Sequence, residues 1–205
     1  MPLEFMITKV FKNSKIAWLI VFGLLLIYNL YYFVLSLEMI FLTKVCLNLL
    51  LVIVFIIQAE AKSEDRTFKS IFVTMVPVMA PLVMSSHGQI IVDYKISMSL
   101  IVLGVTLSAL SIAELWDSFA VLPSLRELKF GGPYRIVRHP IYFGYFISSL
   151  GILLAAFSIT NLCIFLVFIS FTIYRVNLEE NILMIDMKYK QYMKKVRYKV
   201  VPCIY

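Results

Sequence analysis

Six apolar segments dominate the hydrophobic pattern of this chain of 205 residues. They cover residues 16–37, 40–59, 70–84, 96–116, 141–157 and 161–176. A helix that crosses a bilayer needs about 20 predominantly apolar residues, so the pattern predicts a bundle of spanning helices, of which the third and the last two are short. Pro77 and Pro81 lie inside the third segment and predict a kink rather than a break.

The pattern changes after the sixth segment. Apolar side chains recur there every three or four residues, as on one face of a helix. They are Leu178, Ile182, Ile185, Tyr189, Tyr192 and Val196. This spacing predicts an amphipathic C-terminal helix, for which two arrangements are open. The helix either lies on the membrane surface or folds back over the bundle and closes a site.

Composition supports a membrane protein. The chain is 61% hydrophobic and 15% charged, whereas soluble domains are about a quarter charged. A net charge of +7 fits the lysines and arginines of cytoplasmic loops, so we expect no nucleic-acid partner. The three cysteines have neither a disulfide pattern nor zinc-ligand spacing, and no metal site is predicted.

The positions of the basic residues predict the topology. If the N-terminus is cytoplasmic, residues 1–15, 60–69, 117–140 and 177–205, together with Arg175, hold 17 of the 19 lysines and arginines. A count of five spans would separate the basic tail from the basic N-terminus. Six spans with both termini cytoplasmic therefore fit best. We expect Lys44, one of the two exceptions, to reach outward along its helix.

The first polar cluster runs from Gly131 to Gly144 and reads GGPYRIVRHPIYFG. Its Gly-Pro start predicts a tight turn with exposed backbone N–H groups. Arg135 and Arg138 carry fixed positive charge that suits a carboxylate or a phosphate. Pro140 can open the fifth spanning helix. Taken alone, this cluster is better explained as a basic anchor at the inner membrane surface.

The second cluster, from Arg175 to Glu180, follows the sixth segment and reads RVNLEE. Adjacent acids at a membrane boundary are costly unless they face water or a partner. Arg175 and Glu179 are four residues apart and can pair on one helix face. The alternative interpretation is a solvated helix start, where acids suit the helix dipole.

The two clusters follow one another in the order G-P-Y-R-x-x-R-H-P-x-Y-x-G, a short helical hairpin, R-x-x-x-E-E and a tail with two tyrosines. This order resembles the isoprenylcysteine carboxyl methyltransferase family. The related phospholipid N-methyltransferases share the paired acids. The resemblance covers about residues 103–202. The tail differs at Met187-Lys188, where the family often carries Phe-Gly.

This resemblance implies an S-adenosylmethionine-dependent enzyme that methylates a lipid-borne carboxylate, thiol or amine at the cytoplasmic face. Arg138 and Glu180 are the expected catalytic residues. The implied cofactor contacts are Tyr134, Arg138, His139, Tyr142, Gly144, Glu179, Glu180, Tyr189 and Tyr192. The expected fold is an all-α integral membrane protein: a bundle of about six transmembrane helices, with five as the alternative count, and a C-terminal amphipathic helix that closes over the cofactor.

We expect spanning helices 1 to 4 in residues 1–116 and the catalytic region in residues 117–205. The membrane would be the plasma membrane of a prokaryote or the endoplasmic reticulum of a eukaryote. Two other functions stay open. Membrane steroid and sterol reductases, which use a nicotinamide cofactor, carry a similar R-H-P-x-Y-x-G, but an acid often follows their glycine, where this chain has Tyr145. A small transporter or assembly factor is the third interpretation. The sequence does not specify the oligomeric state.

Overall fold

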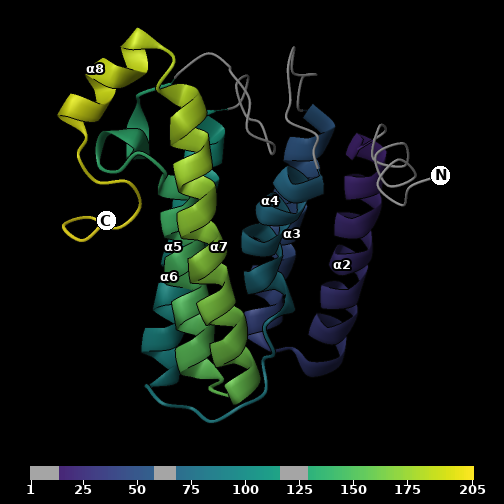
Figure 1. Cartoon of the computed structure of the whole chain (residues 1–205). Coiled ribbons are helices and arrows are strands. Elements are labelled where there is room, and N and C mark those ends of the chain that lie inside the picture. Colours follow the sequence, from purple (N-terminus) through teal and green to yellow (C-terminus); the bar gives the residue numbers. More distant parts are fainter. Residues whose placement is uncertain (1–13, 58–67, 116–128) are drawn as a thin grey trace.

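The computed structural model describes residues 14–57, 68–115 and 129–205. Within them six helices form the bundle, and they run side by side (Figure 1). They are α2 (Ser14–Ser36), α3 (Met39–Ile57), α4 (Phe68–Val83), α5 (Tyr94–Glu114), α6 (Pro140–Ala155) and α7 (Ile159–Leu183). Three of these, α2, α5 and α7, are long and apolar enough to cross a membrane, and the other three are shorter apolar helices. The predicted all-α membrane architecture is confirmed.

The helix bounds follow the apolar segments closely, except at the end of α7. The helix α4 continues through Pro77 and Pro81, and α6 begins at Pro140, as predicted. Proline suits the first position of a helix, since the backbone N–H that it lacks would have no partner there. Two predictions lie outside the described residues. They are the segment ends at residues 59 and 116 and the division between residues 116 and 117.

Successive helices alternate in direction, so α2 begins at the end of the bundle where α7 finishes (Figure 1). The opposite end holds the short connections. There the amide of Asn161 accepts a hydrogen bond from Ser85 N at 2.8 Å and donates to the carbonyl oxygens of Ser85 at 2.9 Å and Ala156 at 2.7 Å. Buried polar groups need such partners. Asn161 thereby ties the α4–α5 connection to the α6–α7 connection, and both polar clusters lie at the other end of the bundle.

Lys44 does not reach the surface. Its side chain is buried, and its ammonium group donates to the carbonyl oxygen of Met84, just after the end of α4. Lys44 thus reaches toward the end of the bundle that holds the short connections, as predicted, but its partner there is a carbonyl group after α4 rather than water. A cation at this position also suits the helix dipole.

The closest helix packing in the described chain is between α5 and α6. A Cβ atom on Gly144 would lie 2.2 Å from Ser108 Oγ and 2.6 Å from the carbonyl oxygen of Gly104. A Cβ atom on Gly104 would in turn lie 2.5 Å from the carbonyl oxygen of Gly144. Small residues allow membrane helices to approach closely in this way. The contact fixes the start of α6 against α5.

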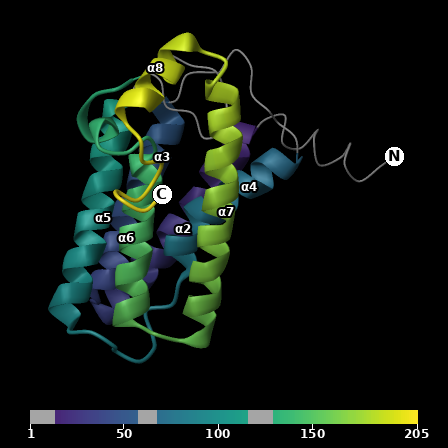
Figure 2. The same ribbon diagram turned by 60° about the vertical axis from the view of Figure 1, so that its left-hand side comes forward.

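The C-terminal part is not one helix. Helix α7 continues seven residues beyond the apolar segment, to Leu183, and α8 (Met187–Lys195) starts after a turn. Asp186 caps α8 by accepting a hydrogen bond from Lys188 N at 2.7 Å. The interpretation of residues 178–196 as one helical face is therefore wrong. Helix α8 instead lies across the end of the bundle, near the end of α7 (Figures 1 and 2).

Candidate functional site

The segment before α6 is shaped around the end of α5. A short 3-10 helix, η2 (Gly132–Arg135), follows Gly131, and Gly132 has a φ of +48°. Glycine adopts such a backbone without the steric cost of a side chain. A Cβ atom on Gly131 would lie 2.0 Å from Glu114 Oε1. The two glycines therefore let this turn lie directly on the carboxylate that ends α5.

The C-terminal tail runs beside the start of α6. Arg138 N donates to the carbonyl oxygen of Tyr198 at 3.0 Å, and His139 N donates to that of Lys199 at 2.7 Å. The guanidinium of Arg138 also donates to the carbonyl oxygen of Arg197 at 3.3 Å. Two of these bonds satisfy the backbone N–H groups of the residues just before α6. They also bring the tail to the end of α7.

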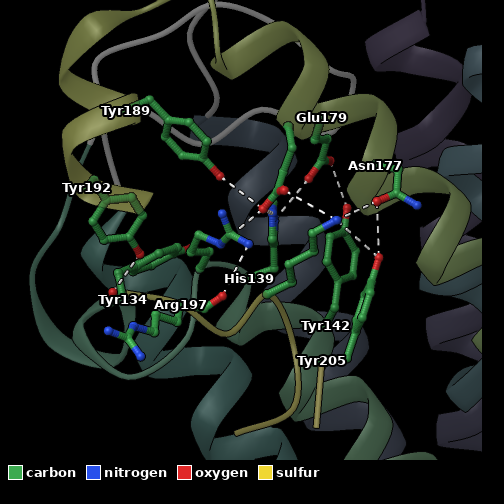
Figure 3. A network of polar contacts seen from close by, with 12 residues as sticks. Tyr134, His139, Tyr142, Asn177, Glu179, Tyr189, Tyr192, Arg197 and Tyr205 are labelled. Carbon is green, nitrogen blue, oxygen red and sulfur yellow. Dashed lines mark hydrogen bonds and ion pairs between the residues drawn. The ribbon is translucent and has the colours of Figure 1, made fainter. Parts of the chain in front are cut away.

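Glu180 of α7 contacts residues just before α6, in α8 and in the tail. Figure 3 shows its neighbours His139, Glu179 and Tyr189. Its Oε1 atom lies 3.1 Å from Arg138 Nε, 3.3 Å from His139 Nε2 and 3.4 Å from the hydroxyl of Tyr189. Its Oε2 atom lies 3.5 Å from Lys199 Nζ. Only 3% of Glu180 is exposed. Protein cations and a hydroxyl thus replace water around this carboxylate.

Glu179 has a separate set of partners. Its Oε1 atom accepts hydrogen bonds from Arg175 at 2.7 and 2.8 Å and from the hydroxyl of Tyr142 at 2.8 Å. Arg175 also donates to the Tyr142 oxygen. The other carboxylate oxygen lies 3.4 Å from His139 Nδ1. The predicted pairing of Arg175 with Glu179 is confirmed, and the imidazole of His139 bridges the two acids.

The position of these acids in α7 makes their partners necessary. Glu179 and Glu180 occupy the last turns of the helix, where the dipole disfavours negative charge. The interpretation as a solvated helix start is therefore wrong. Arg138, Arg175 and Lys199 together carry one more charge than the two carboxylates. This positive excess suits an additional anionic group.

His139 adds to that excess. Burial alone would lower its pKa, but hydrogen bonds and charge interactions with Glu179 and Glu180 outweigh burial and raise the pKa above 6.5. The acids thereby favour the imidazolium form, in which both ring nitrogens are donors. Those nitrogens lie 3.3 Å from Glu180 and 3.4 Å from Glu179.

Tyrosines of α8 and η2 cover the cluster from the side away from the bundle. Tyr189 directs its hydroxyl toward Glu180, and Tyr192 donates to the carbonyl oxygen of Tyr134 at 2.6 Å. Burial, the largest cause, raises the pKa of all three phenols above 10. These hydroxyls therefore stay protonated at neutral pH and act as donors. Phe130 packs on Tyr192 with ring centroids 4.5 Å apart.

The structure brings most of the predicted site residues together. One connected set contains Tyr134, Arg138, His139, Tyr142, Glu179, Glu180, Tyr189 and Tyr192, with Tyr192 joined to the others by its ring contact with Tyr189. Gly144 lies instead in the contact with α5. Whether these residues hold a cofactor stays a prediction.

Three residues that join this connected set were not predicted from the sequence: Asn177, Lys199 and Tyr205. Lys199 Nζ donates to Asn177 Oδ1 at 2.7 Å and lies 5.0 Å from the ring centroid of Tyr205, whose hydroxyl donates to the same amide oxygen at 3.1 Å. The turn that returns the tail to α7 depends on backbone bonds, which have no periodic signal in the sequence. The spacing of Lys199 and Tyr205 along the tail therefore did not indicate that both residues contact Asn177.

Comparison with known proteins supports a methyltransferase. The model of the phospholipid methyltransferase family matches residues 92–191, just under half of the chain. The matched region runs from just before α5 into α8 and includes both polar clusters. No curated protein matches the chain. The matched region is thus similar to a family of membrane methyltransferases, and helices α2 to α4 lie outside the match.

Proposed function

We propose that this protein transfers a methyl group from S-adenosylmethionine to a lipid-borne acceptor at the cytoplasmic membrane face. The observation that carries the proposal is the meeting of Arg138 and His139 with Glu179 and Glu180 beneath the tyrosines of α8. The family match over the same region supports the reaction class.

The described residues fit the chemical groups of this cofactor. The positive excess of the cluster suits the carboxylate of its amino-acid end. Arg138 supports this assignment. Its buried Nε atom forms an ion pair with Glu180 Oε1 at 3.1 Å but makes no hydrogen bond, so this N–H group is a free donor for the cofactor. Buried tyrosine rings and carboxylates suit a sulfonium cation. Tyr134, Tyr142, Tyr189 and Tyr192, with Glu179 and Glu180, are the proposed contacts.

The bound cofactor would supply an activated methyl group, and the protein would supply alignment and a dry environment. Arg138 and Glu180 are the proposed catalytic residues. Both are less than one tenth exposed, whereas 26% of the Lys199 side chain is exposed. We therefore propose that Lys199 marks the side of the cluster that faces water. The helix α8 would close the site by its contact with Glu180.

The geometry favours an acceptor that needs no proton removal. Cations and hydroxyl groups already engage both carboxylates, so Glu179 or Glu180 would have to exchange a partner before it served as a base. A carboxylate acceptor, as in isoprenylcysteine, attacks without a base. A phospholipid amine, which the family match suggests, needs one. We propose the lipid carboxylate, with the amine as the alternative acceptor.

We also propose that both termini face the cytoplasm, where the soluble cofactor is available. The described start of α2 and the site lie at the same end of the bundle (Figure 1). The basic residues of 129–140 and of the tail lie there too, as the positive-inside rule requires of a cytoplasmic surface. In this proposal residues 117–205 carry the catalytic groups and residues 1–116 shape the acceptor side.

Calorimetry on the detergent-purified protein tests the cofactor. We expect saturable binding of S-adenosylmethionine that His139→Ala weakens at least about tenfold, because the variant loses contacts to two charged partners. The matched control is His87→Ala, since this other histidine is exposed at the far end of the bundle. Binding of a nicotinamide cofactor without binding of S-adenosylmethionine would replace the proposal with a reductase.

A further inference from the structure

The outward face of α8 and the adjoining tail form a strongly basic surface. Five exposed basic side chains lie within ten residues: Lys188, Lys190, Lys194, Lys195 and Arg197. None of the five makes an ion pair with a described residue. The chain holds no acidic residue from Met187 to its end. This surface is called the α8 basic face below. Asp186, which caps the start of α8, lies beside it, and the basic side chains outnumber this acid five to one.

The opposite face of α8 reaches the candidate site. Tyr189, Tyr192 and Val196 are buried there and pack against Phe130 and Leu183, among others. The hydroxyl of Tyr189 lies 3.4 Å from Glu180 Oε1. The helix has nine residues, and helices this short are marginal without support from tertiary contacts. Whatever holds the outer face of α8 also positions Tyr189 over the acids.

Exposed apolar side chains lie at the start of α8 and in the C-terminal tail. Ile185 is 71% exposed, Met187 65% and Ile204 82%, and all three lie outside the spanning helices. A basic surface beside exposed apolar side chains suits the boundary between headgroups and acyl chains. The apolar parts of α5, α6 and α7 extend away from this end of the bundle, so α8 lies close to that boundary (Figures 1 and 2).

We propose that the α8 basic face binds the headgroups of anionic phospholipids in the surrounding leaflet, and that this contact holds α8 over the site. Anionic lipids attract basic residues near the surface, and the attraction strengthens binding about fivefold per lysine. A soluble acidic partner would use the charges but leave Ile185, Met187 and Ile204 exposed. The effect on catalysis rests on the proposed function, whereas the lipid contact does not.

The test compares nanodiscs of phosphatidylcholine with nanodiscs of phosphatidylcholine and phosphatidylglycerol. Hydrogen exchange over residues 187–195 measures whether α8 stays folded on the bundle. We expect exchange at least about fivefold slower in the anionic discs, and loss of that difference in the K190E/K194E variant. These lysines are exposed and four residues apart, so they lie on one helix face.

Two controls separate charge from local structure. K190R/K194R keeps the charge and should behave as wild type, and K95E changes a charge at the far end of the bundle without effect. Equal exchange of wild-type protein in both discs would overturn the proposal. Lipid-dependent exchange without any binding of S-adenosylmethionine would leave the lipid contact standing and refute the enzymatic function.

Discussion

Replacing Glu180 with glutamine is expected to reduce methyl transfer at least about a hundredfold. Arg138, His139 and Lys199 all point charge at this one carboxylate, and Tyr189 from α8 reaches it too. Glutamine keeps the size but removes the charge that organises these groups. Its NH₂ group would also face cations that carry only donors. The change therefore disturbs cofactor binding and the closure of α8 together.

Two further variants make this result specific. Glu180→Asp keeps the charge and should retain more activity than Glu180→Gln. Glu38→Gln, at the far end of the bundle, should act as wild type. Activity is measured per folded protein after size-exclusion chromatography, because removing one partner of a buried ion pair also lowers stability. Full activity of the glutamine variant would exclude the acidic pair from the mechanism.

Gly144→Ala is expected to destabilise the protein by about 1 to 3 kcal/mol. The new methyl group would lie 2.2 Å from Ser108 Oγ, 2.6 Å from the Gly104 carbonyl oxygen and 2.8 Å from Ser108 N. Two of these contacts are to backbone, which moves only if α5 and α6 separate. Ser108→Gly removes the hydroxyl contact alone, so it should rescue the variant only partly.

Thermal unfolding in detergent measures this effect, with Gly23→Ala as the matched control. Gly23 lies in α2, and a Cβ atom there would meet nothing within 4 Å. Alanine at that position should leave the melting temperature unchanged or raise it slightly. A Gly144→Ala variant with wild-type stability but no cofactor binding would contradict the packing role and support a direct cofactor contact.

The sequence predicted the helices well because each apolar segment must satisfy its own backbone within the bilayer. The two polar clusters were also recognisable, since buried acids near a membrane boundary require partners. Arg175 and Glu179 paired as their spacing indicated. These inferences depend on local periodicity and on the cost of burying charge, both of which a single sequence contains.

Contacts between distant segments were not predictable. Helix α7 ends at Leu183 and a turn leads to α8, whose start Asp186 caps, although the apolar spacing continues through the turn. The pairing of His139 with the backbone of Lys199 uses a carbonyl group that every residue carries. The place of Gly144 against Ser108 depends on which helix faces α6. Such features follow from tertiary packing, which periodicity does not encode.

The most direct test supplies S-adenosylmethionine with a labelled methyl group to the purified protein in nanodiscs made from native lipid extract. We predict that the label enters the lipid fraction and that mild base releases it as methanol, as for a methyl ester. Label that resists base would identify an amine acceptor within the same reaction class. No transfer to any lipid, with nicotinamide cofactor consumed instead, would contradict the assignment as a methyltransferase.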